Sequence, residues 1–188
     1  MNRSLRINRI VSIALMTAII CVISPFSIAI PVSPVPISLA TLAIYLTVMI
    51  LGWKDGTISV LLYVLIGLAG APVFTGFNGG AGKILGPTGG YIIGYVLLAF
   101  IEGVFVDWAR KLRPYEEAGA TAFFGMLLGT IVLYVFGSLW LAKQSNMSLA
   151  AAFTVGVFPF IIGDVIKMVV ALFVGTRIRR ALVKSNLI

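Results

Sequence analysis

Long apolar segments that lack charged side chains recur along almost the whole chain. Only 11% of the 188 residues are charged and 60% are hydrophobic, whereas a soluble domain carries about 25% charged residues. The 14 cationic and 6 acidic side chains are too few to cover the outside of a soluble fold with this much apolar surface. We therefore expect an integral membrane protein. The net charge of +8 is read as a signal of orientation in the membrane and not of nucleic-acid binding.

The apolar segments predict an all-α fold with six transmembrane helices in one membrane domain, residues 1–188. A spanning helix needs about 20 mostly apolar residues. The predicted spans are about 10–28, 37–53, 56–73, 89–106, 118–142 and 149–176. The first could instead be a signal peptide cleaved after Ala29. Its apolar run is longer than a usual signal core, so an uncleaved first helix is the simpler interpretation.

The distribution of cations orients the six predicted spans. If the amino end is cytoplasmic, eleven cations fall on the cytoplasmic side and only Lys83 and Lys143 fall outside. Cytoplasmic loops of membrane proteins carry an excess of Lys and Arg. This places both termini in the cytoplasm of a multi-pass protein of the cell membrane. The eleven cations are Arg3, Arg6, Arg9, Lys54, Arg110, Lys111, Arg113, Arg177, Arg179, Arg180 and Lys184.

The side chains that most catalytic and metal sites need are scarce. The chain contains no His and a single cysteine, Cys21. A Ser or Cys nucleophile activated by imidazole is therefore excluded, as are disulfides and most transition-metal sites. We expect no enzyme activity, no metal and no cofactor.

Two charges, Asp164 and Lys167, lie inside the last predicted span. Residues three apart share a helix face, so the two charges can neutralise each other at membrane depth. A structural ion pair is one interpretation, but an apolar pair would hold helices together without desolvating charge. We therefore favour a binding site in which Asp164 accepts hydrogen bonds from ligand N–H groups.

A glycine-rich segment runs from Gly76 to Tyr91, before the fourth span. A phosphate-binding loop is excluded because Ile84 follows Gly82-Lys83 where Ser or Thr is required. The dinucleotide pattern fails as well, since Leu85 stands at its third glycine. A flexible connector or a compact re-entrant loop lining a pocket remains. In the second case the lining residues are Asn78, Thr88, Gly89, Gly90 and Tyr91.

Two further spans carry weaker patterns. Ala14 and Ala18 in the first span leave room for another helix to pack closely, either within the protein or from a partner. Thr41 and Tyr45 lie on one stripe of the second span. The stripe indicates an inward face that can contact a ligand.

Three of these segments together resemble one family over essentially the whole chain. They are Pro34-Val35-Pro36-Ile37-Ser38, the Gly-Pro-Thr-Gly-Gly-Tyr run at 86–91, and Gly163-Asp164-Val165-Ile166-Lys167. This combination resembles the BioY family, the biotin-specific substrate-binding (S) components of energy-coupling factor (ECF) transporters.

The resemblance implies a six-helix S-component fold that captures biotin from outside and delivers it across the membrane. It also implies two kinds of partner, a transmembrane T component and two cytoplasmic ATPases that alone bind ATP. Ala14 and Ala18 match the AxxxA motif through which S components dock onto the T component. The ureido ring of biotin suits Asp164 and Asn78, with Lys167 supporting Asp164.

Two other functions remain open on the sequence alone. The chain could be a self-sufficient secondary transporter in which Asp164 and Lys167 relay protons. It could also be a structural membrane protein with an inert buried ion pair. Binding of a ligand distinguishes the S component from the structural protein, and dependence on ATPase partners distinguishes it from the secondary transporter.

Overall fold

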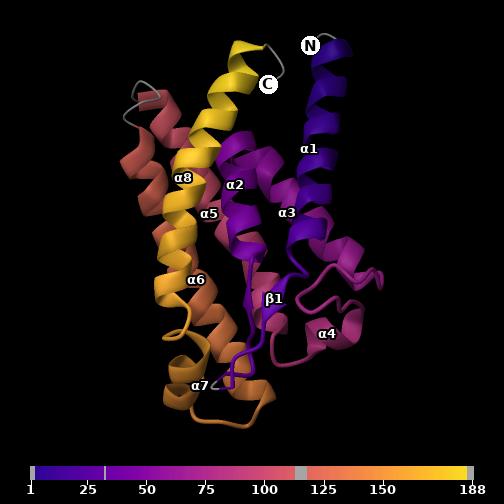
Figure 1. Cartoon of the computed structure of the whole chain (residues 1–188), viewed down its shortest axis with the longest axis vertical. Coiled ribbons are helices and arrows are strands. Elements are labelled where there is room, and N and C mark those ends of the chain that lie inside the picture. Colours follow the sequence, from indigo (N-terminus) through magenta and orange to yellow (C-terminus); the bar gives the residue numbers. More distant parts are fainter. Residues whose placement is uncertain (1–2, 32, 113–117, 186–188) are drawn as a thin grey trace.

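The computed structural model describes residues 3–31, 33–112 and 118–185, and these are mostly helical (Figure 1). Both chain ends lie at one end of the molecule, and the short helices α4 and α7 lie at the other (Figure 1). The described elements are α1 (Arg3–Ile23), β1 (Ser27–Ile28), β2 (Ile37–Ser38), α2 (Ala40–Leu51), α3 (Trp53–Leu68), α4 (Ala81–Leu85), α5 (Gly89–Leu112), α6 (Ala118–Gln144), α7 (Leu149–Gly156) and α8 (Ile161–Lys184).

The helices differ in how well they meet the requirements of a membrane span. Within the described residues, Gly89–Lys111 and Gly119–Gln144 are long and apolar enough to cross a membrane. α7 and α8 would add a third span if the bent pair is one. Ile7–Ile23 and Ala40–Leu51 are apolar but shorter. The mostly helical architecture is confirmed, and the count of six spans stays a prediction.

The last predicted span, 149–176, is not one continuous helix. α7 ends at Gly156 and α8 begins at Ile161, with a bend of 48° between them. Pro159 lies in the break. A proline has no backbone N–H to donate and clashes with the preceding turn, so it interrupts a helix. Asp164 consequently lies in the first turn of α8.

Other predicted boundaries also differ from the structure. α1 ends at Ile23 and Ser27–Ile28 pairs with Ile37–Ser38 as a short antiparallel ladder, so the predicted ends at 28 and 37 were wrong. Lys54 and Asp55, predicted to lie in a turn, belong to the first turn of α3. α5 continues to Leu112, through residues predicted as a polar connection. The predicted connection also includes Arg113, which lies outside the described residues.

The break between α2 and α3 is a single residue, Gly52, with φ of +86°. A Cβ there would lie 2.5 Å from Asp107 Oδ1, so only glycine fits. Asp107 Oδ2 accepts a hydrogen bond from the Trp53 backbone N–H at 3.2 Å, and Arg110 donates to the Met49 carbonyl oxygen at 2.6 Å. These contacts satisfy backbone groups at the two helix ends and fix α2 against α5.

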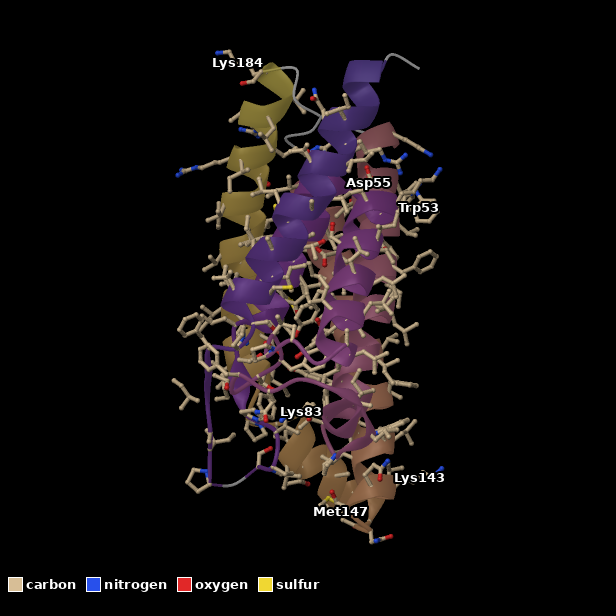
Figure 2. The ribbon with its side chains drawn as sticks, turned by 90° about the vertical axis from the view of Figure 1, so that its right-hand side faces the viewer. Trp53, Asp55, Lys83, Lys143, Met147 and Lys184 are labelled. Atoms are coloured by element: carbon tan, nitrogen blue, oxygen red, sulfur yellow. The ribbon has the colours of Figure 1, made fainter. Side chains whose placement is uncertain are left out.

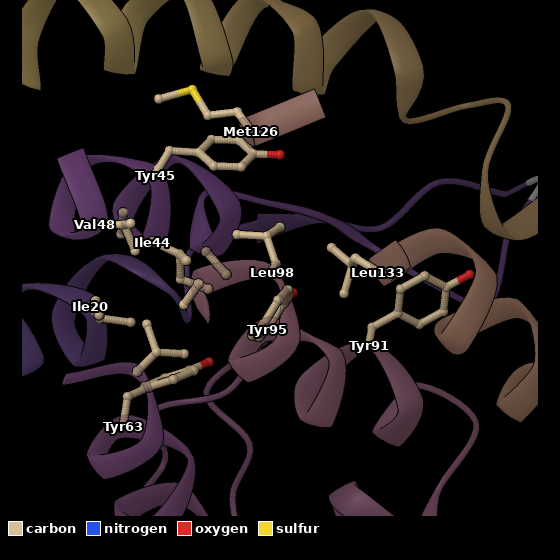
Figure 3. Packing of buried hydrophobic residues seen from close by; sticks show 14 of the residues in the cluster. Ile20, Ile44, Tyr45, Val48, Tyr63, Tyr91, Tyr95, Leu98, Met126 and Leu133 are labelled. Carbon is tan, nitrogen blue, oxygen red and sulfur yellow. The ribbon is translucent and has the colours of Figure 1, made fainter. Parts of the chain in front are cut away.

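The core lies between α2, α3, α5, α6 and α8, with α5 and α6 packed most extensively against each other. Glycines make this close approach possible. A Cβ at Gly125 of α6 would lie 2.5 Å from the Phe105 side chain, and one at Gly94 of α5 would lie 2.7 Å from Leu133. Figure 3 shows Tyr45 beside Met126, and Tyr95 beside Leu98, among the aliphatic side chains of this core.

The charges at the molecule's surface lie mostly toward its two ends. Asp55 and Lys184 lie toward the end that carries both termini, and Lys83 and Lys143 lie toward the opposite end (Figure 2). Between them the surface is apolar, with exposed residues such as Leu65, Phe100 and Val169. An apolar belt between two polar ends is the surface that a bilayer requires.

Candidate ligand cavity

A buried cluster of polar groups forms where α8 packs against α2 and α6. Asp164 is 4% exposed. Its Oδ1 accepts hydrogen bonds from Lys167 Nζ at 2.8 Å and from Thr41 Oγ1 at 3.0 Å, and its Oδ2 accepts one from the Tyr134 hydroxyl at 2.7 Å. A carboxylate that accepts from a cation and two hydroxyls is well stabilised in its ionised form.

Lys167 uses all its donors inside this cluster. Nζ lies 2.8 Å from Asp164 Oδ1, 2.7 Å from the Ser38 carbonyl oxygen and 3.1 Å from Thr41 Oγ1. An ammonium has three N–H groups, so none is left for a ligand in this arrangement. Asp164 accepts three hydrogen bonds, and a carboxylate can accept about four. The free acceptor position is therefore on Asp164 Oδ2.

A hollow opens on this cluster between α2, α5, α6 and α8. It contains about 360 Å³ of empty space, part of it open to the outside. Asp164 and Lys167 lie at its polar end, and the other lining residues are mainly aromatic and aliphatic. The full lining is Val35, Pro36, Ser38, Thr41, Tyr91, Tyr95, Leu133, Tyr134, Gly156, Phe160, Asp164 and Lys167.

A second hollow of about 300 Å³ shares four lining residues with the first. The shared residues are Val35, Pro36, Tyr91 and Tyr95. Its remainder is lined by Ile92 and by three hydroxyl-bearing side chains, namely Tyr63 of α3, Thr75 just before the glycine-rich segment, and Thr88 within that segment. The Tyr63 hydroxyl pairs with the Ser24 hydroxyl at 2.6 Å. The two hollows are therefore adjacent chambers, one ending on an anion–cation pair and the other on neutral hydroxyl donors.

Two glycines position Tyr91 between the chambers. A Cβ at Gly137 would lie 2.4 Å from the Tyr91 ring, and one at Gly156 would lie 2.3 Å from its hydroxyl oxygen. The Tyr91 hydroxyl donates to the Gly156 carbonyl oxygen at 2.9 Å. α6 and α7 thus form a slot that holds this ring in one orientation.

The structure brings together five of the residues predicted for the site. Thr41, Asp164 and Lys167 form the polar cluster, and Tyr91 lines both chambers. Thr88 is buried and lines the second chamber. These residues come from α2, α5, α8 and the turn before α5, so the fold assembles them from distant parts of the sequence.

Four other predicted site residues do not line either chamber. Asn78 is exposed, and its side-chain amide donates to the carbonyl oxygens of Thr75 and Gly76 within its own loop. Tyr45 is fully buried, and its hydroxyl pairs with Thr130 at 2.6 Å. Gly89 and Gly90 are packing positions, because a Cβ there would collide with Ile84 and Trp140.

The glycine-rich segment is a folded loop in this structure. It contains α4, and the Trp140 side chain donates to the Gly86 carbonyl oxygen at 3.0 Å. Partial burial lowers the pKa of the Lys83 ammonium in α4. Of the two interpretations left open for this segment, the packed loop fits these contacts better than a flexible connector.

Sequence reasoning missed several lining residues. Tyr134, Tyr95 and Leu133 lie in apolar helices where nothing distinguishes them from ordinary core residues. Val35, Pro36 and Ser38 had a signal, because they belong to the proline-rich segment after the first span. Within the described residues, no group of three or more His, Cys, Asp or Glu side chains could hold a metal ion.

The helices carry an apolar belt and pack around a partly enclosed cavity that has one charged end. These features define a membrane protein with a binding site for a small molecule. Comparison with known proteins identifies the family. The BioY family profile matches residues 1–184, and the chain belongs to the BioY family.

Curated relatives support this assignment. A probable biotin transporter BioY of Pyrococcus horikoshii is 37% identical over 152 residues, which cover 81% of this chain and 85% of the relative. The biotin transporter BioY2 of Lactococcus lactis subsp. cremoris is 34% identical over 174 residues, covering 93% and 91%. Relatives of this family are named as transporters and not as enzymes.

A solved structure shows the same fold. The crystal structure of the S-component for biotin from an ECF-type ABC transporter superposes with a TM-score of 0.85 at 33% sequence identity. The match covers 96% of this chain and 95% of that one. The chain therefore has the S-component fold of a biotin transporter.

Proposed function

We propose that this chain binds biotin in the two-chambered cavity and serves as the substrate-binding subunit of an ECF-type uptake transporter. The observation that carries the proposal is the free acceptor position on Asp164 Oδ2 at the end of an aromatic hollow. The ureido ring of biotin is neutral and has two N–H donors. Its sulfur-containing ring requires apolar walls, which Leu133 and Phe160 offer.

The second chamber suits the other end of the same ligand. The valerate chain of biotin is apolar and ends in a carboxylate. Thr75 and Thr88 offer hydroxyl donors in this chamber. A ligand of this length would pass Tyr91 and Tyr95, which line both chambers, and would occupy them together.

Lys167 acts through Asp164 in this proposal. Its three donors are already engaged, so it holds the carboxylate ionised and oriented. The alternative proton relay requires Lys167 or Asp164 to exchange protons with water. Three donors on Asp164 and three acceptors around Lys167 give the pair a fixed arrangement that argues against a relay.

The membrane topology is part of the same proposal. Six spans with both termini in the cytoplasm fit the positive-inside rule, and both chain ends do lie at one end of the molecule (Figure 1). The cavity would then open toward the outside, near α4 and α7. Localisation in the cell membrane follows from an uptake function.

Docking on a T component with two ATPases would use the outer face of α1. Ala14 and Ala18 are exposed, whereas Met16, Thr17 and Ile20 on the same helix are buried. Two small residues four apart on an exposed face permit close approach of a partner helix. Their exposure also argues against the internal-packing interpretation. ATP would be bound only by the partner subunits.

Calorimetric titration of the detergent-purified, ligand-free chain tests the binding proposal. We expect saturable binding of biotin at one molecule per chain and no heat with thiamin or riboflavin at the same concentrations. Absence of heat with biotin from a folded preparation would contradict the proposal and leave the structural interpretation of the Asp164–Lys167 pair.

Docking is tested separately by co-purification with the T component and ATPases. Ala14→Trp and Ala18→Trp should abolish the complex and leave biotin titration unchanged, because a large side chain blocks close helix contact. Ala120→Trp, at an exposed alanine of α6, is the matched control and should assemble normally. Loss of biotin binding in the α1 variants would mean that these alanines pack against other helices of the same chain.

A further inference from the structure

Glu102 is the second carboxyl buried in the helical core, and it lies outside the cavity. It belongs to α5 and is 0% exposed. Neither carboxyl oxygen has a hydrogen-bond partner in the part of the chain that the structure describes. α6 closes tightly over this position, since a Cβ at Gly125 would lie 3.2 Å from the Glu102 carbonyl oxygen.

Burial without a partner determines the chemical form of this carboxyl. An isolated carboxylate costs far more to bury than a neutral carboxylic acid, so such a group is held with its proton. Loss of this proton inside the closed core would require a cation or several donors beside the carboxylate.

The charged groups around Glu102 do not supply such a partner. Tyr45 on α2 and Arg110 on α5 interact with it electrostatically. Arg110 is held by Asp107 at 2.7 Å and by the Met49 carbonyl oxygen. Only Lys143 is charged among the residues of α6, and it lies at the far end of that helix.

The remaining neighbouring helices also hold their charges elsewhere. On α3, Asp55 is paired with Arg9, and Lys54 lies over the Trp53 ring. On α8, Asp164 is held by its three donors, and Arg179 donates to the Ile50 carbonyl oxygen. Each of these charged groups is therefore held by a group other than Glu102.

Buried hydroxyls on α2 and α6 lie next to the polar end of the cavity. Thr41 and Tyr45 are one turn apart on α2, and Thr130 and Tyr134 are one turn apart on α6. The Tyr45 and Thr130 hydroxyls pair at 2.6 Å, while Thr41 and Tyr134 both donate to Asp164. The electric fields of Asp164 and of Glu102 both act on Tyr45.

We propose that Glu102 is a proton-binding site inside the membrane domain, and that its protonated carboxyl responds through Tyr45 to occupancy of the cavity. The second half rests on the proposed biotin function. A ligand N–H that takes the free acceptor position on Asp164 Oδ2 neutralises part of the carboxylate charge. This changes the electric field at Tyr45, and thereby the environment of the Glu102 acid.

Infrared difference spectroscopy tests the proton directly, because a protonated carboxylic acid has a C=O stretch that a carboxylate lacks. The spectrum of the ligand-free wild type minus that of Glu102→Gln at neutral pH should contain this band. Asp55→Asn removes a surface carboxyl that is paired with Arg9 and should leave the band intact. If Glu102→Gln did not fold, Glu102→Asp should shift the band. A difference spectrum without the band would overturn the proton site.

The link to the cavity is tested by adding biotin. The biotin-minus-free difference spectrum of the wild type, corrected by that of Glu102→Gln to cancel the carbonyl bands of biotin itself, should show the acid band shifted. An unshifted band in a preparation that calorimetry shows to be saturated would overturn the link. Absence of biotin binding would instead refute the proposed ligand, while the band in the ligand-free protein would still establish the proton site.

Discussion

Asp164 and Glu102 are both buried carboxyls, yet their surroundings are opposite. Asp164 accepts hydrogen bonds from three side chains and lines a hollow. Glu102 has no partner in the described chain and lies in a closed helix interface. The difference shows that burial of a carboxyl group is not enough to make a ligand-binding site. A ligand-binding carboxylate also needs donors that keep it ionised and a space that leaves an acceptor position free.

The largest effect is expected from removing one charge of the cavity pair. Asp164→Leu leaves the Lys167 ammonium buried without its counter-ion, and breaking a buried pair in this way costs about 3–5 kcal/mol of stability. The midpoint of thermal unfolding in detergent should fall strongly. The double variant Asp164→Leu/Lys167→Leu should recover most of the stability and bind no biotin. If the double variant also bound biotin, the Asp164–Lys167 pair would have a structural role only.

Asp164→Asn tests the role of the Asp164 charge in biotin affinity. It keeps the shape of the side chain and removes the charge, so a ligand N–H loses a charge-assisted hydrogen bond worth roughly 1.5–3 kcal/mol. Biotin affinity measured by titration should fall about 10- to 100-fold. Lys143→Ala, at the far end of α6, is the control and should bind as the wild type does. Equal affinities for both variants would mean that Asp164 does not contact biotin.

The walls of the cavity should respond more weakly than its charged end. In Gly156→Ala the new Cβ would lie 2.3 Å from the Tyr91 hydroxyl oxygen, so the ring must leave its slot. Overpacking of this kind costs about 1–3 kcal/mol, and we expect biotin affinity to fall by about one order of magnitude. Gly163→Ala is the matched control, since a Cβ there meets no atom within 4 Å. Comparable losses in both variants would mean that Tyr91 does not shape the site.

Glu102→Gln should have the smallest effect on folding. A neutral acid and an amide are similar in size and charge, so exchange of one for the other should change the free energy of unfolding by no more than about 1 kcal/mol. Chemical denaturation in detergent measures this difference, with Asp164→Leu compared in the same assay. A loss as large as that of Asp164→Leu would mean that Glu102 is ionised and paired, which would erase the contrast between the two carboxyls.

The sequence predicted the charged end of the cavity because charge inside an apolar segment stands out. Glu102 carried the same signal within the predicted span 89–106 and was missed. Tyr134 and Tyr95 could not be predicted, because tyrosine is unremarkable in an apolar helix and only the packing of α5, α6 and α8 brings these rings to Asp164. The hydrogen bonds of Asn78 within its loop depend on backbone turns, including φ of +57° at Phe77, that composition does not reveal.

The helix pattern shows a similar division. The long helices α5 and α6 were predicted within a few residues, apart from the carboxyl end of α5, because hydrophobic length determines them. The break between α7 and α8 was missed although Pro159 was visible, since a proline can either kink a span or end it. The strand pair at Ser27 and Ile37 depends on contact between residues on both sides of the proline-rich segment, which no local pattern encodes.

A structure of the chain with biotin bound tests the central claim most directly. The account predicts a ureido nitrogen within about 3.2 Å of Asp164 Oδ2, with the valerate chain passing Tyr91 into the chamber lined by Thr75 and Thr88. Biotin bound elsewhere on the molecule, or in this cavity with its carboxylate at Lys167 and its ureido ring away from Asp164, would contradict it.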